Sequence, residues 1–309
     1  MAFSLDEHWV WDFWLADNGE IFHLFYLRAP KALGDPELRH RFARIGHATS
    51  VDLLQWEDHG EVLGPGPEGS HDQTATWTGS VVRGDDGIWR MFYTGASFES
   101  DDSYANIETI CVATSFDLFA WQKDASFSLS ADARYYEKLG DGDWPEEAWR
   151  DPWVYRDPSE SGWHMLITAR GKSSDMRSGG VIGHAWSEDL ECWSVLPPLG
   201  PPSNTFPHLE VPQIAQIGGT SVLVFCAPRT TADTDGPMQT SGVWAVETSG
   251  PPAPVWVDDA ELLAPAPYYA GRIVQDRSGT ATLLAFIGSP GSNFEGTISD
   301  PIALEPAAR

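Results

Sequence analysis

The chain has 309 residues, and 45 Asp and Glu against 19 Lys and Arg give it a formal net charge of −26 at pH 7. Nucleic acids and anionic membrane surfaces are bound by clustered Lys and Arg, so this charge argues against both as partners. The hydrophobic fraction of 42% and the charged fraction of 21% are typical of a folded globular protein rather than of a disordered chain.

The N-terminal segment, residues 1–7, has neither the basic stretch nor the apolar stretch of a secretory leader. No run in the chain approaches the roughly 18 apolar residues that predict a transmembrane helix. We therefore expect a cytoplasmic protein.

Short β-branched and aromatic runs bounded by Gly, Pro and Asp occur along the whole chain, whereas helical periodicity is scarce. A strand, a tight turn and a second strand are predicted five times. These units lie, in chain order, at residues 13–26, 79–93, 152–167, 211–225 and 272–286. Their turns are typical of β-hairpins, as in Asp17-Asn18-Gly19.

A second pattern recurs downstream of the first three hairpins, at residues 46–56, 111–121 and 183–193. The three copies align without gaps and share Ala, Ser, Asp-Leu and Trp at fixed positions. We interpret the Ser as the end of a strand, Asp-Leu as the turn, and Trp as the start of the next strand, with its ring covering the sheet.

Repeated units of about four strands predict a β-propeller, and five such units predict five blades. We therefore expect an all-β protein in which residues 1–309 form one domain, a five-bladed β-propeller. An irregular β-sandwich is the alternative. Residues 298–304 are expected to return to the first blade and close the ring.

Three blade entries carry a carboxylate. The innermost strand of each blade lines the central channel, so the starts of these strands converge on one pocket. Asp12, Asp151 and Glu210 stand at three of the five starts, beside aromatic residues or Pro. Carboxyl groups whose environments separate their pKa values can act as nucleophile and acid in the cleavage of a glycosidic bond. The alternative is that these are turn residues among the 45 acidic positions.

At these positions the chain resembles the levansucrase and invertase superfamily, glycoside hydrolase families 68 and 32. The matching motifs are Val10-Trp11-Asp12-Phe13-Trp14, Trp77-Thr78-Gly79-Ser80, Arg150-Asp151-Pro152 and Leu209-Glu210-Val211-Pro212-Gln213. They occur in the family's order and on its blades. The chain departs from both families at Val211, where levansucrases carry Arg and invertases Cys. It resembles a compact member that consists of the propeller alone, without the C-terminal β-sandwich of invertases.

The resemblance implies hydrolysis of β-fructofuranosides, such as sucrose or fructo-oligosaccharides, by a retaining double displacement. Asp12 would be the nucleophile, Asp151 the transition-state stabiliser and Glu210 the general acid/base. The residues that would bind the substrate are Trp11, Trp14, Trp77, Ser80 and Arg150. For the indoles the alternative is packing between blades, and for Arg150 it is a structural ion pair; Thr78 or Ser80 would contact the sugar or Asp12.

Other functions stay open on the sequence alone. A fructosyltransferase, or a furanosidase of the arabinofuranosidase and arabinanase type, would use the same three carboxylates. Two non-enzymatic alternatives are a sugar-binding propeller that no longer catalyses and a purely structural interaction propeller.

Two further segments and two histidines stand out. Residues 28–44 form a basic loop, interpreted as solvated or as a subunit contact, or alternatively as a segment that reaches over the pocket and binds an anionic group such as a sugar phosphate. Residues 97–109 are expected at the pocket rim. Their acidic residues lack the spacing of a calcium loop, so we expect no metal and no cofactor. His47 and His184 belong to the strand pattern and are expected in the core.

Overall fold

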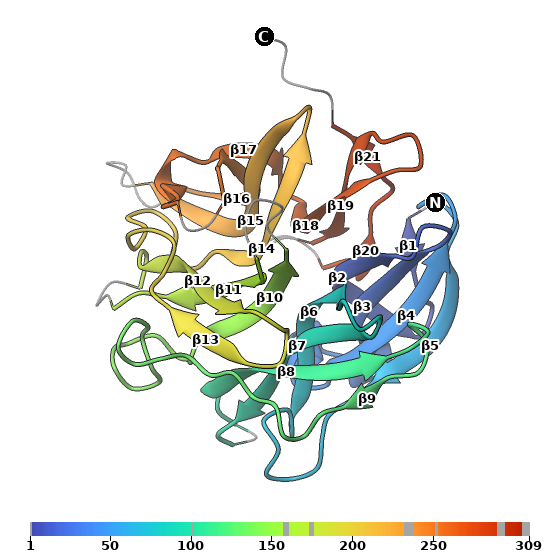
Figure 1. The fold of residues 1–309 in the computed structure, drawn as a ribbon. Helices are drawn as coiled ribbons and strands as arrows, with labels where there is room; N and C mark the ends of the chain where they lie inside the picture. The colour runs from blue at the N-terminus through green and yellow to red at the C-terminus, as the bar shows by residue number, and fades with distance from the viewer. Residues whose placement is uncertain are drawn as a thin grey trace.

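The computed structural model describes residues 2–100, 102–156, 161–172, 176–231, 238–250, 253–288 and 294–304. Five antiparallel sheets are arranged as a ring around a common axis (Figure 1). In each sheet the strands lie side by side in chain order, from the innermost strand outward, except in the last. The prediction of a five-bladed β-propeller is confirmed, and the β-sandwich alternative is wrong.

The strands of the ring have the following bounds. The first blade contains β2 (His8–Asp17), β3 (Phe22–Pro30), β4 (Arg44–Ser50) and β5 (Glu57–Leu63). The second contains β6 (Ala75–Arg83), β7 (Trp89–Phe98), β8 (Asn106–Ser115) and β9 (Gln122–Lys123). The third contains β10 (Trp149–Tyr155), β11 (Trp163–Arg170), β12 (Gly180–Ser187) and β13 (Trp193–Leu196). The fourth contains β14 (Glu210–Ile217), β15 (Thr220–Thr231), β16 (Met238–Glu247) and β17 (Glu261–Pro265). The fifth contains β18 (Tyr268–Gln275), β19 (Ala281–Ile287), β20 (Thr297–Ile298), β21 (Ile302–Ala303) and, from the N-terminus, β1 (Phe3–Ser4).

The ring is closed by the N-terminus and not as expected from the sequence. β20 pairs with β1 and with β19, and β21 pairs with β19, so residues 297–303 stay within the fifth blade. The first blade already has four strands of its own and needs none from the C-terminus. The N-terminal β1 instead crosses to the last blade and joins the two ends of the chain.

The recurring Ser-x-Asp-Leu segment forms a corner at the outer edge of three blades. In the second blade β8 ends at Ser115, whose Oγ accepts the N–H of Leu118 at 2.9 Å. Asp117 Oδ1 accepts two further N–H groups, and Leu118 takes a φ of 69°. The Trp121 indole N–H donates to the Leu118 carbonyl at 3.1 Å. The same corner follows β4 and β12, which end at Ser50 and Ser187 as predicted.

Each innermost strand contains a β-bulge near its start. The pairing register shifts between Trp11 and Phe13, Trp77 and Gly79, Arg150 and Trp153, Glu210 and Gln213, and Tyr269 and Arg272. In the last three strands the bulge places a non-glycine residue at positive φ, namely Asp151 at 57°, Val211 at 54° and Ala270 at 47°. A bulge bends the strand and redirects its side chains. The five bulges therefore lie at equivalent places around the axis.

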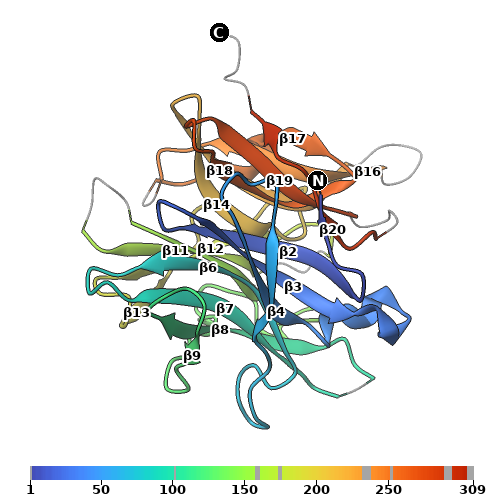
Figure 2. The ribbon, with the colours of Figure 1, turned by 90° about the vertical axis from the view of Figure 1, so that its right-hand side faces the viewer.

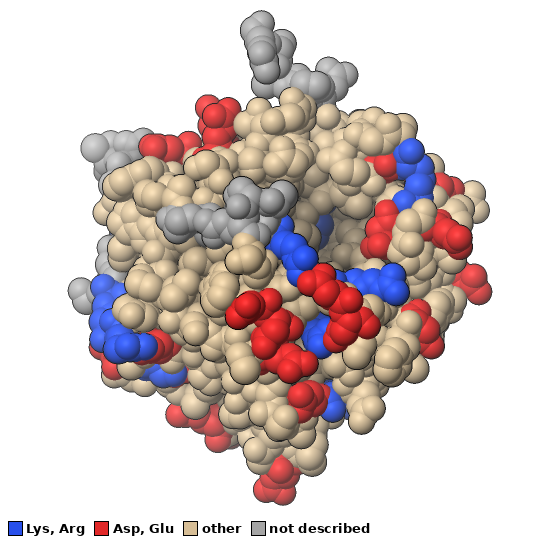
Figure 3. Space-filling model, in the orientation of Figure 1, with Lys and Arg blue, Asp and Glu red and all other residues tan. Residues whose placement is uncertain are grey.

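The surface is strongly acidic, as the composition requires. On the face drawn in Figure 3, carboxylate side chains gather beside the central hollow with basic side chains between them. His47 and His184 are buried. His47 is hydrogen-bonded to His23, and His184 to His164, each at 3.0 Å. Their predicted placement in the core is therefore confirmed. Within the described ranges, no helix combines the length and the apolar character needed to cross a bilayer. A cytoplasmic location stays a prediction.

We predict that Ser115→Ala lowers the free energy of unfolding by about 1–2 kcal/mol, because the buried Leu118 N–H loses its acceptor. Urea unfolding measures the effect. The matched control is Ser194→Ala at an exposed position of β13, which we expect to change the stability by less than about 0.5 kcal/mol. Equal effects of the two substitutions would contradict the role of the corner.

Candidate active site

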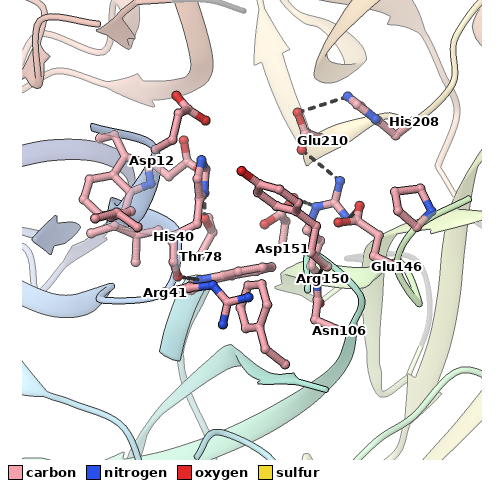
Figure 4. A pocket seen from close by; sticks show the side chains of 18 of the residues that line it. Asp12, His40, Arg41, Thr78, Asn106, Glu146, Arg150, Asp151, His208 and Glu210 are labelled. Atoms are coloured by element: carbon pink, nitrogen blue, oxygen red, sulfur yellow. Dashed lines mark hydrogen bonds and ion pairs between the residues drawn. The ribbon is translucent and has the colours of Figure 1, made fainter. Parts of the chain in front are cut away.

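A cavity of about 510 Å³ opens where the innermost strands begin, and residues of four blades line it. Asp12 from β2, Asp151 from β10 and Glu210 from β14 all face it (Figure 4). The predicted convergence of the three carboxylates is therefore present in the structure. Their surroundings differ, and the pKa values of the three carboxyl groups are shifted differently.

Asp12 stands at the bulge of β2 in an apolar part of the cavity. The Thr78 hydroxyl donates to its Oδ2 at 3.0 Å. Burial, followed by the charges of Asp151 and Glu210, raises the pKa of Asp12 to about 7, against the opposing effect of the Thr78 hydrogen bond. Asp12 therefore changes its ionisation close to neutral pH.

Asp151 is only 3% exposed and is fixed by three hydrogen bonds. Its Oδ2 accepts the Thr168 hydroxyl at 2.9 Å and the Val211 N–H at 3.1 Å, and its own N–H donates to Thr94 Oγ1 at 2.9 Å. Burial raises its pKa, and the neighbouring Arg150 opposes that shift. These contacts join blades two, three and four and leave the carboxylate little freedom to move.

Glu210 is surrounded by groups that stabilise its ionised form. Arg150 Nη2 donates to Oε1 at 2.9 Å, and His208 Nε2 lies 3.2 Å from Oε2 (Figure 4). The Tyr269 hydroxyl donates to Oε2 at 2.6 Å. Burial favours the neutral acid, but His208, Arg150 and the Tyr269 hydrogen bond outweigh it and hold the pKa of Glu210 well below its ordinary value. Asp12 and Glu210 thus have widely separated pKa values.

Arg150 holds the carboxylates of the cavity together. Its guanidinium is 7% exposed and donates to Glu108 at 3.1 Å and to Glu146 at 2.8 Å, in addition to Glu210. Its Nε lies 3.7 Å from Asp151 Oδ2. An arginine can donate hydrogen bonds to several carboxylates at once because its guanidinium carries five N–H donors in a plane. Of the two alternatives for this residue, the structure shows the ion pairs.

The predicted sugar-binding residues divide into two groups. Trp11 and Trp77 line the cavity, and the Trp77 indole N–H donates to the His40 carbonyl at 2.7 Å. Trp14 and Ser80 do not line it. Trp14 is fully buried against Phe25, and Ser80 Oγ accepts the Val154 N–H at 3.0 Å between two blades. Both follow the bulge on their strands and face the core, so their predicted contact with the sugar is not supported.

Several groups in and around the cavity were not predicted from the sequence, namely His40, Glu108, Glu146, His208 and Tyr269. Two of them could have been found. His208 precedes Glu210 by two residues, which places both on one face of an extended chain. Tyr269 stands at the start of the fifth innermost strand, at the place that Glu210 has in the fourth. Glu108 lies on β8, and His40 and Glu146 lie on connecting segments whose paths the sequence does not specify.

Two loops cover the cavity. The segment after β3 contains the short 3-10 helices η1 (Lys31–Leu33) and η2 (Pro36–His40), which project from one end of the ring as the blue coil of Figure 2. The lining residues of this segment are Asp35, Glu37, Leu38, His40 and Arg41, and those of the β7–β8 segment are Phe98, Asp102, Tyr104 and Asn106. The predicted rim position of residues 97–109 is confirmed. In the part of the chain described, no group of three or more His, Cys, Asp and Glu could hold a metal ion.

Comparison with known proteins identifies the family. The model of the glycosyl hydrolases family 32 N-terminal domain matches residues 14–300. The chain belongs to glycosyl hydrolase family 32. The matched span includes Asp151 and Glu210 and begins two residues after Asp12, so the role of Asp12 rests on its motif and on the geometry above.

The chain is similar to proteins that are named for the hydrolysis of sugars. A sucrose-6-phosphate hydrolase of Zymomonas mobilis is 30% identical over 227 residues, which cover 69% of this chain and 40% of the relative. A raffinose invertase of Escherichia coli is 30% identical over 132 residues, which cover 42% of this chain and 24% of the relative. The chain thus spans less than half the length of these relatives.

Solved structures share the fold. A family 32 β-fructofuranosidase of Bombyx mori has a TM-score of 0.74 at 20% identity, over 98% of this chain and 62% of that one. An inulosucrase of Halalkalicoccus jeotgali, solved bound to kestose, has a TM-score of 0.72 at 21% identity, over 93% of this chain and 79% of that one.

We predict that Thr78→Val raises the pKa of Asp12 above its value of about 7, because the hydroxyl that stabilises the carboxylate is lost. The titration of the Asp carboxyl carbons, followed by NMR, measures the change. Thr280→Val, at an exposed position, is the matched control and should leave the Asp12 titration unchanged. An Asp12 midpoint that does not move in Thr78→Val would refute the assigned hydrogen bond.

Proposed function

We propose that the chain is a retaining glycosidase that hydrolyses β-fructofuranosides, such as sucrose or fructo-oligosaccharides. The observation that carries the proposal is the convergence of Asp12, Asp151 and Glu210 on one cavity. Membership of family 32 supports it, as do the activities named for the similar hydrolases.

In the first step a carboxylate oxygen of Asp12 attacks the anomeric carbon of the fructosyl unit. The bond from that carbon to the leaving oxygen breaks, and Glu210 gives its proton to the leaving oxygen. In the second step water attacks the same carbon, Glu210 takes the proton from the water, and the bond to Asp12 breaks. Two displacements retain the configuration of the anomeric carbon.

The remaining residues hold the ring and the acids in place. Asp151 is fixed by Thr168 and Val211 and accepts hydrogen bonds from ring hydroxyls with its free carboxylate oxygen. Arg150 orients Glu210, and Trp11 and Trp77 form apolar walls of the sugar subsite. This arrangement stabilises the transition state because the polar groups are positioned before the substrate arrives.

We predict that Asp12→Asn lowers kcat for fructose release from sucrose by about 10³-fold or more, and Glu210→Gln by about 10²–10⁴-fold. Because a nitrophenyl leaving group needs no proton, Glu210→Gln should release it from an aryl β-fructofuranoside much faster than Asp12→Asn does. Glu20→Gln, an exposed carboxylate on a turn, is the matched control and should keep full activity.

Three outcomes separate the alternatives. Full activity of Asp12→Asn would exclude the proposed nucleophile. Transfer of the fructosyl unit to sugar in preference to water would indicate a fructosyltransferase. Binding of sucrose without turnover by the unmodified protein would indicate a sugar-binding propeller.

The pH dependence follows from the two pKa values. The reaction needs Asp12 ionised and Glu210 protonated, which is one proton on the pair. The pair carries one proton in the pH range that lies above the low pKa of Glu210 and below the pKa of Asp12, which is about 7. We therefore predict that kcat/KM is greatest in weakly acidic solution and falls as the pH rises through about 7. In Thr78→Val the fall should move to higher pH. A kcat/KM that stays level above neutral pH in both proteins would contradict this assignment.

A further inference from the structure

We infer that the leaving-group side of the cavity accepts uncharged sugars and excludes sugars that carry a phosphate. The inference rests on the proposed function, since it concerns the group that departs from the fructosyl unit. It separates this chain from the similar sucrose-6-phosphate hydrolase of Zymomonas mobilis with respect to substrate charge.

The charge of the cavity wall is the first observation. Seven carboxylates line the cavity, and the lining arginines are Arg41 and Arg150, so the formal charge of the wall is −5 with its histidines neutral, and −4 when Asp12 and Glu210 share the one proton that the reaction needs. The four carboxylates outside the catalytic set are Asp35, Glu37, Asp102 and Glu146. A wall of one sign in a cavity with a low dielectric focuses the field and repels ligands of the same sign. A phosphate ester brings up to two further negative charges to this wall.

The second observation is that both lining arginines already donate hydrogen bonds to groups of the protein. Arg150 donates to Glu108, Glu146 and Glu210. Arg41 donates to the carbonyls of Ser100 and Ser103, and its guanidinium lies 4.2 Å from the centre of the Phe98 ring.

The rest of the basic segment 28–44 is engaged in the same way. Arg39 donates to Glu37 at 3.0 Å and stacks on Phe294 at 4.2 Å, Arg44 donates to Glu61 at 3.0 Å, and Lys31 donates to the Leu5 carbonyl at 2.8 Å. Arg28 Nη2 lies 3.1 Å from His8 Nδ1. The internal segments outside the described ranges contain no Lys or Arg in the sequence. The segment does reach over the cavity, but it brings carboxylates to the wall together with Arg41.

The third observation is the kind of surface that remains for the leaving group. Tyr104 is 78% exposed at the rim, and Phe98 lines the cavity with it. Carboxylates accept hydrogen bonds from sugar hydroxyls, and aromatic rings pack against the apolar faces of sugar rings. Aromatic rings next to carboxylates can therefore bind a neutral sugar, but they provide no positive charge that would bind a phosphate.

The test compares sucrose with sucrose phosphorylated on the glucosyl 6-hydroxyl. We expect kcat/KM for sucrose to be at least about 100-fold higher at about 0.05 M salt, and the ratio to shrink at about 0.5 M salt as the wall is screened. Equal or better use of the phosphorylated sugar would overturn the inference while leaving the proposed hydrolase intact.

Substitution of Asp102 tests the repulsion directly, since this residue is exposed at the rim and outside the catalytic set. Relative to sucrose, kcat/KM for the phosphorylated sugar should rise about threefold in Asp102→Asn and about tenfold in Asp102→Lys. Glu188→Gln, an exposed charge removed from another blade, is the matched control and should leave the ratio unchanged. A ratio that does not respond to Asp102→Lys would count against repulsion by the wall.

Loss of the proposed function is distinguishable. If neither sugar is hydrolysed, the hydrolase proposal fails, and calorimetric titration with the same two sugars decides the inference. Tighter binding of sucrose supports it, whereas tighter binding of the phosphorylated sugar, or no binding of either, overturns it.

Discussion

The site depends on one buried guanidinium. Three carboxylates in one cavity repel one another, and each loses hydration, so the arrangement is stable only with a buried counter-charge. Arg150 supplies it by donating to Glu210, Glu146 and Glu108 while lying close to Asp151. Arg150 also contributes to the asymmetry of the site. His208 and Arg150 hold the pKa of Glu210 low, whereas the Thr78 hydroxyl is the hydrogen-bond donor found for Asp12 among the described residues, and the pKa of Asp12 is raised. Arg150 thus stabilises the cavity and, together with His208, distinguishes the two acids.

The ring of blades provides the second requirement of the site, which is the correct position of its side chains. The cavity residues come from strands far apart in the chain, and the bulge near the start of each innermost strand sets the direction of the side chains there. Cross-blade hydrogen bonds then fix the result, as when Val211 of the fourth blade donates to Asp151 of the third. The fold and the site are therefore coupled through the backbone of the innermost strands, and the outer strands and their corners support them.

The sequence predicted the fold well because the repeat is local. The Ser-x-Asp-Leu corners and the hairpin turns depend on neighbouring residues, so they are visible as patterns, and β4, β8 and β12 end where the pattern predicts. The three carboxylates could be found because each stands at or directly before the bulge near the start of an innermost strand. Trp14 and Ser80 were placed wrongly because a bulge changes the alternation of inward and outward side chains. The bulge itself is not marked by any residue type in the sequence. Glu146 and His40 could not be found because they lie on long connecting segments, and β1 was missed because its partner stands at the other end of the chain.

The bulges have an evolutionary consequence. Thr78 and Ala270 occupy the same place in the second and fifth blades as Asp12 and Asp151 do in the first and third, so the backbone adopts this shape with or without an acid. The strained φ at Asp151, Val211 and Ala270 costs about 1–3 kcal/mol each, whatever the side chain. A lineage that loses its acids therefore keeps its ring and its aromatic wall. Loss of catalysis in this architecture therefore needs only side-chain replacements and no change of fold.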